Sequence, residues 1–255
     1  MTSLTAVRRA ERNTVVSTLA LAAAAWIALA VAGRTGLAGR LHHPALGASS
    51  GELDPSLFLF GWLLMVAAMM LPASLRFVTT IHRLVQARDN RRSLIAVALG
   101  AYALPWVIVG QLFQVGDVGV HWLVAQWGWL AGRPWLVTAA ALVLAGLYQF
   151  SPLNLRCLRE CRNPTGFVAR GWHGESPRRE LVQIGAAYGW SCVGCCWALM
   201  LLMFAAGASS LGLMAALTAT MVAERRLPRV ERAVGALLVG AGALVALQVL
   251  PPLAT

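Results

Sequence analysis

The five cysteines of this 255-residue chain fall into two groups, each spaced like ligands on one face of a helix. Cys157 and Cys161 are four residues apart, and Cys192, Cys195 and Cys196 follow the spacing i, i+3, i+4. Residues three or four apart lie on the same side of a helix, so each group points its thiols in one direction. A single buried cysteine usually packs as a small apolar side chain. Five cysteines arranged in this way favour a binding site instead.

Methionines add a second kind of sulfur to these segments. Met65 and Met69 share a helix face with Met70 beside them, and Met200 continues the face of the second cysteine group. Thiolate and thioether ligands select soft ions, copper(I) above all. Sites made of cysteine alone also suit zinc or an iron–sulfur cluster. The sequence therefore predicts a sulfur-rich metal site, with copper(I) as the expected ion and zinc or iron–sulfur as alternatives.

The segments that carry these residues are apolar enough to cross a membrane. The chain is 58% hydrophobic and 12% charged, whereas a soluble protein carries about 25% charged residues. A helical span needs roughly 20 apolar residues. We expect one all-α domain over residues 1–255, a polytopic bundle of transmembrane helices. Its seven expected spans are 14–33, 56–79, 93–115, 134–155, 181–206, 208–223 and 232–250.

The positions of the basic residues indicate how this bundle is oriented. All 21 of them are arginines, and 18 lie on the inner side of the expected spans if the N-terminus is cytoplasmic. Cytoplasmic loops carry such an excess of basic residues. The distribution explains the net charge of +11 without a nucleic-acid partner. We expect a cytoplasmic N-terminus, an external C-terminus and a tight hairpin at the small residues 207–210.

Two connecting segments are expected to contain helices. The outer segment 116–133 has three tryptophans, which favour the membrane interface, so we expect a short helix on the membrane surface. In the inner segment 151–180, Pro152 and Pro164 bracket a helical piece, and Pro152 would kink or end the fourth span. His82 lies among the arginines of an inner loop, where solvent or lipid headgroups are its expected partners.

Enzymatic functions receive less support from the sequence. The expected spans carry no carboxylate, which disfavours a proton-coupled pump, and the phosphate-binding motif G-x-x-x-x-G-K-[ST] is absent. Cys192 and Cys195 form a C-x-x-C pair, so a quinone-linked thiol–disulfide oxidoreductase is an alternative. The expected cytoplasmic position of Cys157 and Cys161 is reducing, which favours metal binding over disulfide chemistry. A structural membrane subunit is the third alternative.

Three motifs in order resemble a known family. They are W-x-x-M-x-x-A-M-M-x-P over 62–72, Y-Q-x-x-P-L-x-x-x-C-L-x-x-C-R-x-P over 148–164, and C-V-G-C-C-W-A-L-M over 192–200. Together they resemble the bacterial predicted metal-binding integral membrane proteins, whose relatives include a copper chaperone for a tyrosinase. The resemblance covers about residues 56–230. The chain departs from the family pattern at Asn154, where the family usually has lysine, so a role for that cation is not carried over.

The resemblance implies a multi-pass protein of the bacterial inner membrane, surrounded by lipid, that delivers copper to a copper-dependent metalloprotein and has no catalytic role. By matching position, its expected ligands are the five cysteines together with Met65, Met69 and Met70. Ligand exchange is the expected mechanism. Cys157 and Cys161 would take up the ion, the other three cysteines would hold it, and methionine thioethers would release it outward.

Overall fold

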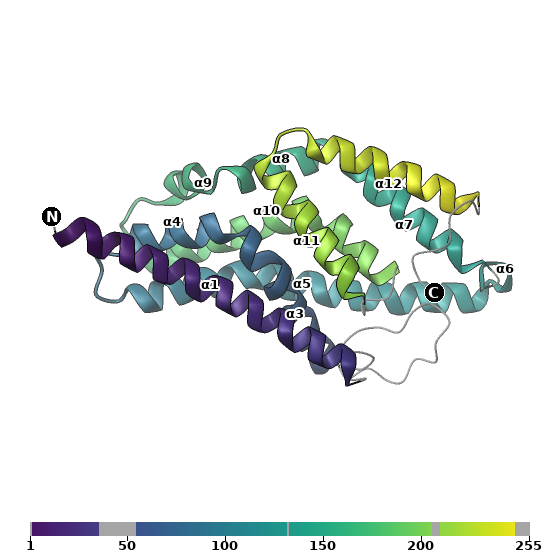
Figure 1. The fold of residues 1–255 in the computed structure, drawn as a ribbon, viewed down its shortest axis with the longest axis horizontal. Helices are drawn as coiled ribbons and strands as arrows, with labels where there is room; N and C mark the ends of the chain where they lie inside the picture. The colour runs from purple at the N-terminus through teal and green to yellow at the C-terminus, as the bar shows by residue number, and fades with distance from the viewer. Residues whose placement is uncertain (1, 36–54, 132, 206–209, 248–255) are drawn as a thin grey trace.

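The computed structural model describes residues 2–35, 55–131, 133–205 and 210–247, and the regular structure in these ranges is entirely helical (Figure 1). The expected all-α fold is therefore confirmed. The helices are α1 (Thr2–Arg34), α3 (Pro55–Ala73), α4 (Leu75–Val85), α5 (Arg91–Gln126), α6 (Gly128–Ala131), α7 (Pro134–Tyr148), α8 (Pro152–Arg162), α9 (Pro164–Gly171), α10 (Pro177–Ala205), α11 (Leu211–Arg226) and α12 (Val230–Ala246). The hairpin expected at 207–210 lies, except for its last residue, outside the described residues.

Several of these helices have the length and composition of a membrane span. In the described ranges, four segments qualify: Glu11–Arg34, Ser56–Ala73, Arg91–Val124 and Pro177–Met203. The pair α7 and α8 would add a fifth span, but a bend of 65° separates the two helices. α11 and α12 have 16 and 17 residues, fewer than the roughly 20 of a full crossing. Each of the seven expected segments contains a helix, while the count of seven spans and the cytoplasmic N-terminus stay predictions.

The expected span over 56–79 does not form a single helix, because α3 and α4 meet at a break at Ser74. Pro72 lies just before the break and has no N–H to donate to the carbonyl of Ala68. The indole of Trp26 on α1 donates a hydrogen bond to this carbonyl instead, at 3.1 Å. The proline thus ends the second apolar helix early and fixes α1 against it.

The expectation of a separate surface helix over 116–133 is also wrong. α5 continues without a break to Gln126, and only the short α6 follows it. Gly116 and Gly119 lie in this extension and have no neighbouring side chain or backbone close to them. A glycine costs a helix about 1 kcal/mol without ending it, so the apolar helix runs on past the expected boundary.

The expected break at Pro152 is confirmed. α7 ends at Tyr148, and α8 begins with Pro152 at its first position. The hydroxyl of Ser151 accepts a hydrogen bond from the backbone N–H of Asn154 at 3.1 Å, which caps α8. Pro164 begins α9 in the same way. The bend between α7 and α8 turns α8, and its two cysteines, back against α10.

α10 occupies the centre of the bundle, in contact with α5, α7, α8, α9 and α11, while α1 lies along α3 and α12 along α7 (Figure 1). Two glycines on α10 allow its backbone to approach α5 closely. A side chain at Gly185 or Gly189 would come within 2.4 Å of the carbonyl oxygen of Ala98 or 2.6 Å of that of Tyr102. α10 therefore holds the second cysteine group in the interior.

Candidate metal centre

Five sulfur-bearing side chains from three helices meet in the interior, and we call them the sulfur cluster. They are Cys161 of α8, Cys192, Cys195 and Cys196 of α10, and Met70 of α3. The Sγ atoms of Cys195 and Cys161 are 3.6 Å apart, and the Sγ atoms of Cys196 and Cys192 lie 3.8 and 4.0 Å from the Sδ of Met70. All five side chains are buried.

Cys157 lies at the edge of this cluster and is half-buried. Its sulfur packs against Gly194 of α10, where a Cβ atom would come within 2.5 Å of it. The absence of a side chain at Gly194 therefore makes room for Cys157 next to the cluster. The two cysteine groups, separate in the sequence, face each other across the contact between α8 and α10.

The four methionines predicted as ligands occupy different places. Met70 contacts the thiols of Cys192 and Cys196. Met65, Met69 and Met200 are buried in the same core, and in the described part of the chain none of the three accepts a hydrogen bond from a cysteine. Their spacing placed them on shared helix faces, but spacing alone did not separate the methionine at the thiols from those that fill the core.

Arg225 of α11 reaches into the sulfur cluster, a contact that the sequence analysis did not predict. Its Nη2 atom donates to the Sγ of Cys192 at 2.7 Å and lies 3.7 Å from that of Cys195. Its Nη1 atom donates to the carbonyl of Ala73 at 3.0 Å, at the break between α3 and α4. The thiolate is the form of cysteine that binds metals. A buried guanidinium at this distance supplies the positive charge that balances such a thiolate.

A signal for Arg225 does exist in the sequence. The buried side chains of α11 include Met214, Leu217, Met221 and Arg225, which recur at intervals of three and four residues, as on one helix face. The arginine therefore continues the apolar face of α11 rather than its polar side. Counted among the arginines that flank a span, it was interpreted only as a marker of orientation.

Polar side chains close the site around Cys192. The hydroxyl of Tyr102 on α5 lies 3.1 Å from the Sγ of Cys192 and 2.8 Å from the hydroxyl of Ser74. The backbone carbonyl of Cys192 also accepts hydrogen bonds from the thiols of Cys196 at 2.7 Å and of Cys195 at 3.2 Å. The cysteines are thus held by partners on α5 and α10 as well as by Arg225.

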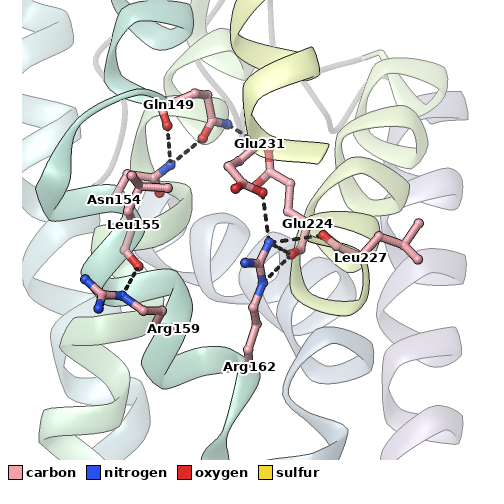
Figure 2. Close-up of polar contacts among 8 residues, drawn as sticks. All are labelled: Gln149, Asn154, Leu155, Arg159, Arg162, Glu224, Leu227 and Glu231. Atoms are coloured by element: carbon pink, nitrogen blue, oxygen red, sulfur yellow. Dashed lines mark hydrogen bonds and ion pairs between the residues drawn. The ribbon is translucent and has the colours of Figure 1, made fainter. Parts of the chain in front are cut away.

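Arg162, at the end of α8, joins this helix to the segment that connects α11 and α12 (Figure 2). Its guanidinium donates to the carbonyl of Glu224 at 2.9 and 2.6 Å and to that of Leu227 at 3.0 Å. It also forms an ion pair of 2.8 Å with the buried carboxylate of Glu231. Because Glu224 directly precedes Arg225, Arg162 fixes the end of α11 that carries the guanidinium.

A second set of contacts in Figure 2 holds the carboxylate of Glu224. The amide of Gln149 donates to Glu224 Oε1 at 2.9 Å, and the amide of Asn154 donates to Gln149 Oε1 at 2.6 Å. Asn154 is completely buried. A neutral amide therefore stands at the position where the family pattern has lysine, and its partner is another amide.

Among the described residues, no group of three or more histidine, cysteine, aspartate or glutamate side chains is already arranged around a point that could hold a metal ion. The thiols of Cys161 and Cys195 have their sulfurs 3.6 Å apart. Ligands bound to one zinc ion through sulfur lie about 2.3 Å from it, so two such sulfurs are at most about 4.6 Å apart. The thiols of Cys161 and Cys195, 3.6 Å apart, are within this limit.

A comparison with protein families identifies the class of this protein. The sequence model of the PpoB2 family, described as a copper chaperone, matches residues 59–245. The chain therefore belongs to this copper chaperone family, and the match runs from within α3 to the end region of α12. No match was found among curated proteins or among solved structures. The resemblance expected from the three motifs is confirmed.

Proposed function

We propose that this protein is a membrane-embedded copper(I) chaperone that takes up the ion at its cysteines and passes it to a copper-dependent metalloprotein. The observation that carries the proposal is the position of Cys161 next to Cys195, with Met70 next to Cys196. Thiolates combined with a thioether suit copper(I) better than zinc, which takes no thioether in its usual sites. Family membership supports the choice of copper.

Charge supports a pair of thiolates as the resting ligands. Copper(I) bound by two thiolates carries a net charge of −1, and an unbalanced buried charge is costly. Arg225 is buried beside Cys192 and Cys195 and supplies one positive charge. The complex of ion, two thiolates and guanidinium is therefore neutral, which suits a site inside an apolar bundle.

Transfer would proceed by ligand exchange between sulfurs. Cys157 and Cys161 on α8 take up the ion at the end of the bundle where Arg76 and Arg226 lie. Among Cys192, Cys195 and Cys196, two thiols then hold it as thiolates, and Met70 supplies a thioether beside them. Met65, Met69 and Met200 belong to the proposed outward path only if the core around them rearranges. The setting of this path is a bacterial inner membrane that the chain crosses with a cytoplasmic N-terminus.

Copper content of the purified protein tests the proposal. Protein from copper-supplemented cells is expected to contain close to one copper per chain, and a variant with all five cysteines replaced by serine is expected to contain none. A Cys161→Ser/Cys195→Ser variant changes only the pair of thiols 3.6 Å apart, and it keeps the test valid if the fivefold variant misfolds. Equal copper in all three proteins, each folded by circular dichroism, would overturn the proposal.

The same pair of thiols also favours a second candidate, a thiol–disulfide oxidoreductase, because sulfurs 3.6 Å apart need little movement to form a bond. Alkylation of the thiols before and after exposure to an oxidised quinone separates the two functions. A disulfide between Cys161 and Cys195 that forms and is reduced in cycles would support the oxidoreductase. Thiols that stay reduced while copper binds would support the chaperone.

A further inference from the structure

A cavity of about 150 Å³ lies where the break between α3 and α4 meets α8 and α11. Its lining includes three arginines and one thiol, Arg76, Arg225, Arg226 and Cys161, together with the apolar side chains of Pro72 and Val222. Cys161 belongs to the sulfur cluster, and Arg225 contacts the thiols of Cys192 and Cys195 in it. The cavity therefore reaches the sulfur cluster from the arginine-rich end of the bundle.

The charge of this cavity has one sign. Arg76 and Arg226 are exposed, while Arg225 and Cys161 are buried, so the cavity runs from an outer pair of arginines to an inner guanidinium and thiol. Its lining contains no carboxylate. Within the described chain, neither Arg76 nor Arg226 forms an ion pair. A cavity lined by one sign of charge raises the local concentration of oppositely charged molecules.

The size of the cavity limits what can enter it. An apolar cavity of about 150 Å³ holds a molecule as large as benzene, so this one accommodates a ligand of a few heavy atoms rather than a protein loop. A bare copper(I) ion is positively charged and would be repelled by three arginines. An anionic complex of the same ion would be attracted.

We infer that copper(I) reaches Cys161 through this cavity as an anionic complex with a small thiol that carries a carboxylate. The inference rests on the proposed chaperone function and names the form in which its cargo arrives. Arg76 and Arg226 bind the carboxylate of the complex, and its copper faces Cys161.

The exchange step balances without an oxidant or reductant. A copper–sulfur bond to the donor breaks and one to Cys161 forms, while the proton of the Cys161 thiol moves to the departing donor thiolate. Copper stays in its +1 state throughout. A second exchange, with Cys195 at 3.6 Å from Cys161, brings the ion into the sulfur cluster.

Three thiols of similar size and different charge test the inference. Metal-free protein is mixed with copper(I) complexes of mercaptoacetate, 2-mercaptoethanol or 2-aminoethanethiol at equal free copper(I), and uptake is followed by the ultraviolet absorbance of the copper–thiolate bonds. Uptake is expected to be fastest from mercaptoacetate and slowest from 2-aminoethanethiol. The spread is expected to be about tenfold or more at low salt and to shrink as salt is added.

Two variants that each lose two positive charges show whether the arginines of the cavity cause this difference in uptake. Arg76→Gln/Arg226→Gln is expected to slow uptake from mercaptoacetate to the rate of 2-mercaptoethanol, leaving the latter rate unchanged. Arg92→Gln/Arg178→Gln removes two exposed arginines outside the cavity and is expected to leave all rates unchanged. Equal rates from the three complexes, or equal effects of both variants, would overturn the inference. After either result, copper bound at equilibrium would still support the chaperone function. If the protein took up copper from none of the three complexes, both the inference and the chaperone function would be contradicted.

Discussion

Arg225 Nη2 lies 2.7 Å from the sulfur of Cys192, although the two residues are 33 positions apart and on different helices. The contact ties α11 to the centre of the bundle and places a fixed positive charge where copper is proposed to bind. It also separates two roles that arginines have in this chain. Most of them flank apolar segments, whereas this one is part of the site.

Replacing Arg225 by glutamine is expected to weaken copper(I) binding. A hydrogen bond to a charged group contributes about 1.5–3 kcal/mol, so the dissociation constant should rise by about tenfold or more. Arg225→Lys keeps the charge and should lose less. Competition with a chromogenic copper(I) chelator measures the constant. Arg232→Gln, at an exposed position on α12, is the control, and an Arg225→Gln protein with the affinity of the wild type would contradict the assigned role.

Replacing Gly194 by alanine is expected to separate α8 from α10. The added Cβ would lie 2.5 Å from the sulfur of Cys157, and overpacking of this kind costs about 1–3 kcal/mol. Thermal unfolding in detergent should show the loss. The double variant Gly194→Ala/Cys157→Ala removes the clashing sulfur and should recover most of the stability. If the double variant stays as unstable as Gly194→Ala, the clash is not the cause.

The single variant Cys157→Ala tests whether Cys157 takes up copper. Cys157→Ala alone leaves the packing of Gly194 intact, so a slower uptake of copper(I) would come from the missing thiol. We expect slower uptake with little change in the equilibrium affinity, because Cys157 lies at the edge of the sulfur cluster. A large loss of affinity would instead make Cys157 a resting ligand.

Replacing Arg162 by glutamine is expected to loosen the segment between α11 and α12. It removes the ion pair with Glu231 and the hydrogen bonds to the carbonyls of Glu224 and Leu227. Loss of one partner of a fully buried pair costs about 3–5 kcal/mol, and the partial exposure of Arg162 reduces this to about 1–3 kcal/mol. Hydrogen–deuterium exchange over 224–231 should increase.

Arg159→Gln is the matched control for this experiment. Arg159 is exposed, and its guanidinium donates to the carbonyl of Leu155 in its own helix. Its removal should leave exchange over 224–231 unchanged. Equal exchange in the Arg162 and Arg159 variants would show that the contacts in Figure 2 do not hold α11 in place.

His82 is expected to make stability depend on pH. Its Nδ1 atom forms a hydrogen bond of 3.0 Å with the hydroxyl of Thr14 on α1, so α1, rather than only solvent or lipid, is its partner. Burial lowers the pKa of His82 below its ordinary value of 6.5, the charge of Arg91 lowers it further, and Glu11 partly opposes the shift. The folded protein therefore favours the neutral ring, and this stability is present above pH 6.5 and lost as the pH falls below it.

The melting temperature at pH 7.5 and pH 5.5 measures this effect. The wild type should lose more stability between the two values than His82→Gln, whose side chain does not titrate. His173→Gln replaces an exposed histidine outside this contact and should behave as the wild type. An identical pH dependence in wild type and His82→Gln would contradict the assignment.

The sequence predicted the helices and the sulfur site better than it predicted their partners. Apolar segments and the spacing of cysteines depend on local periodicity, which is visible in one chain. The contact between Cys161 and Cys195 depends on the bend before α8, and Pro152 indicated that a bend was present but not where it pointed. Met70 differs from Met65 and Met69 only in its neighbours on other helices, which spacing does not reveal.

The helix boundaries that were predicted wrongly, at the ends of α3 and α5, depend on contacts that composition does not reveal. Pro72 lies in a segment that reads as one apolar run, and its effect depends on Trp26 satisfying the carbonyl that it leaves unpaired. The extension of α5 depends on glycines that a long helix tolerates. Arg225 was interpreted from its place beside an apolar segment, because burial of an arginine is rare and depends on the thiols that receive it.

The close approach of α10 to α5 has a consequence for how copper could leave. A Cβ atom at Gly185 or Gly189 would clash with the carbonyl of Ala98 or Tyr102 on α5, so sliding α10 along α5 would press other side chains against this backbone. We therefore expect α10 and its three thiols to keep their positions during the proposed delivery of copper. The movement that releases copper is then expected in α8 and α11, which carry Cys161 and Arg225 and are joined by the hydrogen bonds from Arg162 to the carbonyl of Glu224. Release of the ion would then depend on when these hydrogen bonds break.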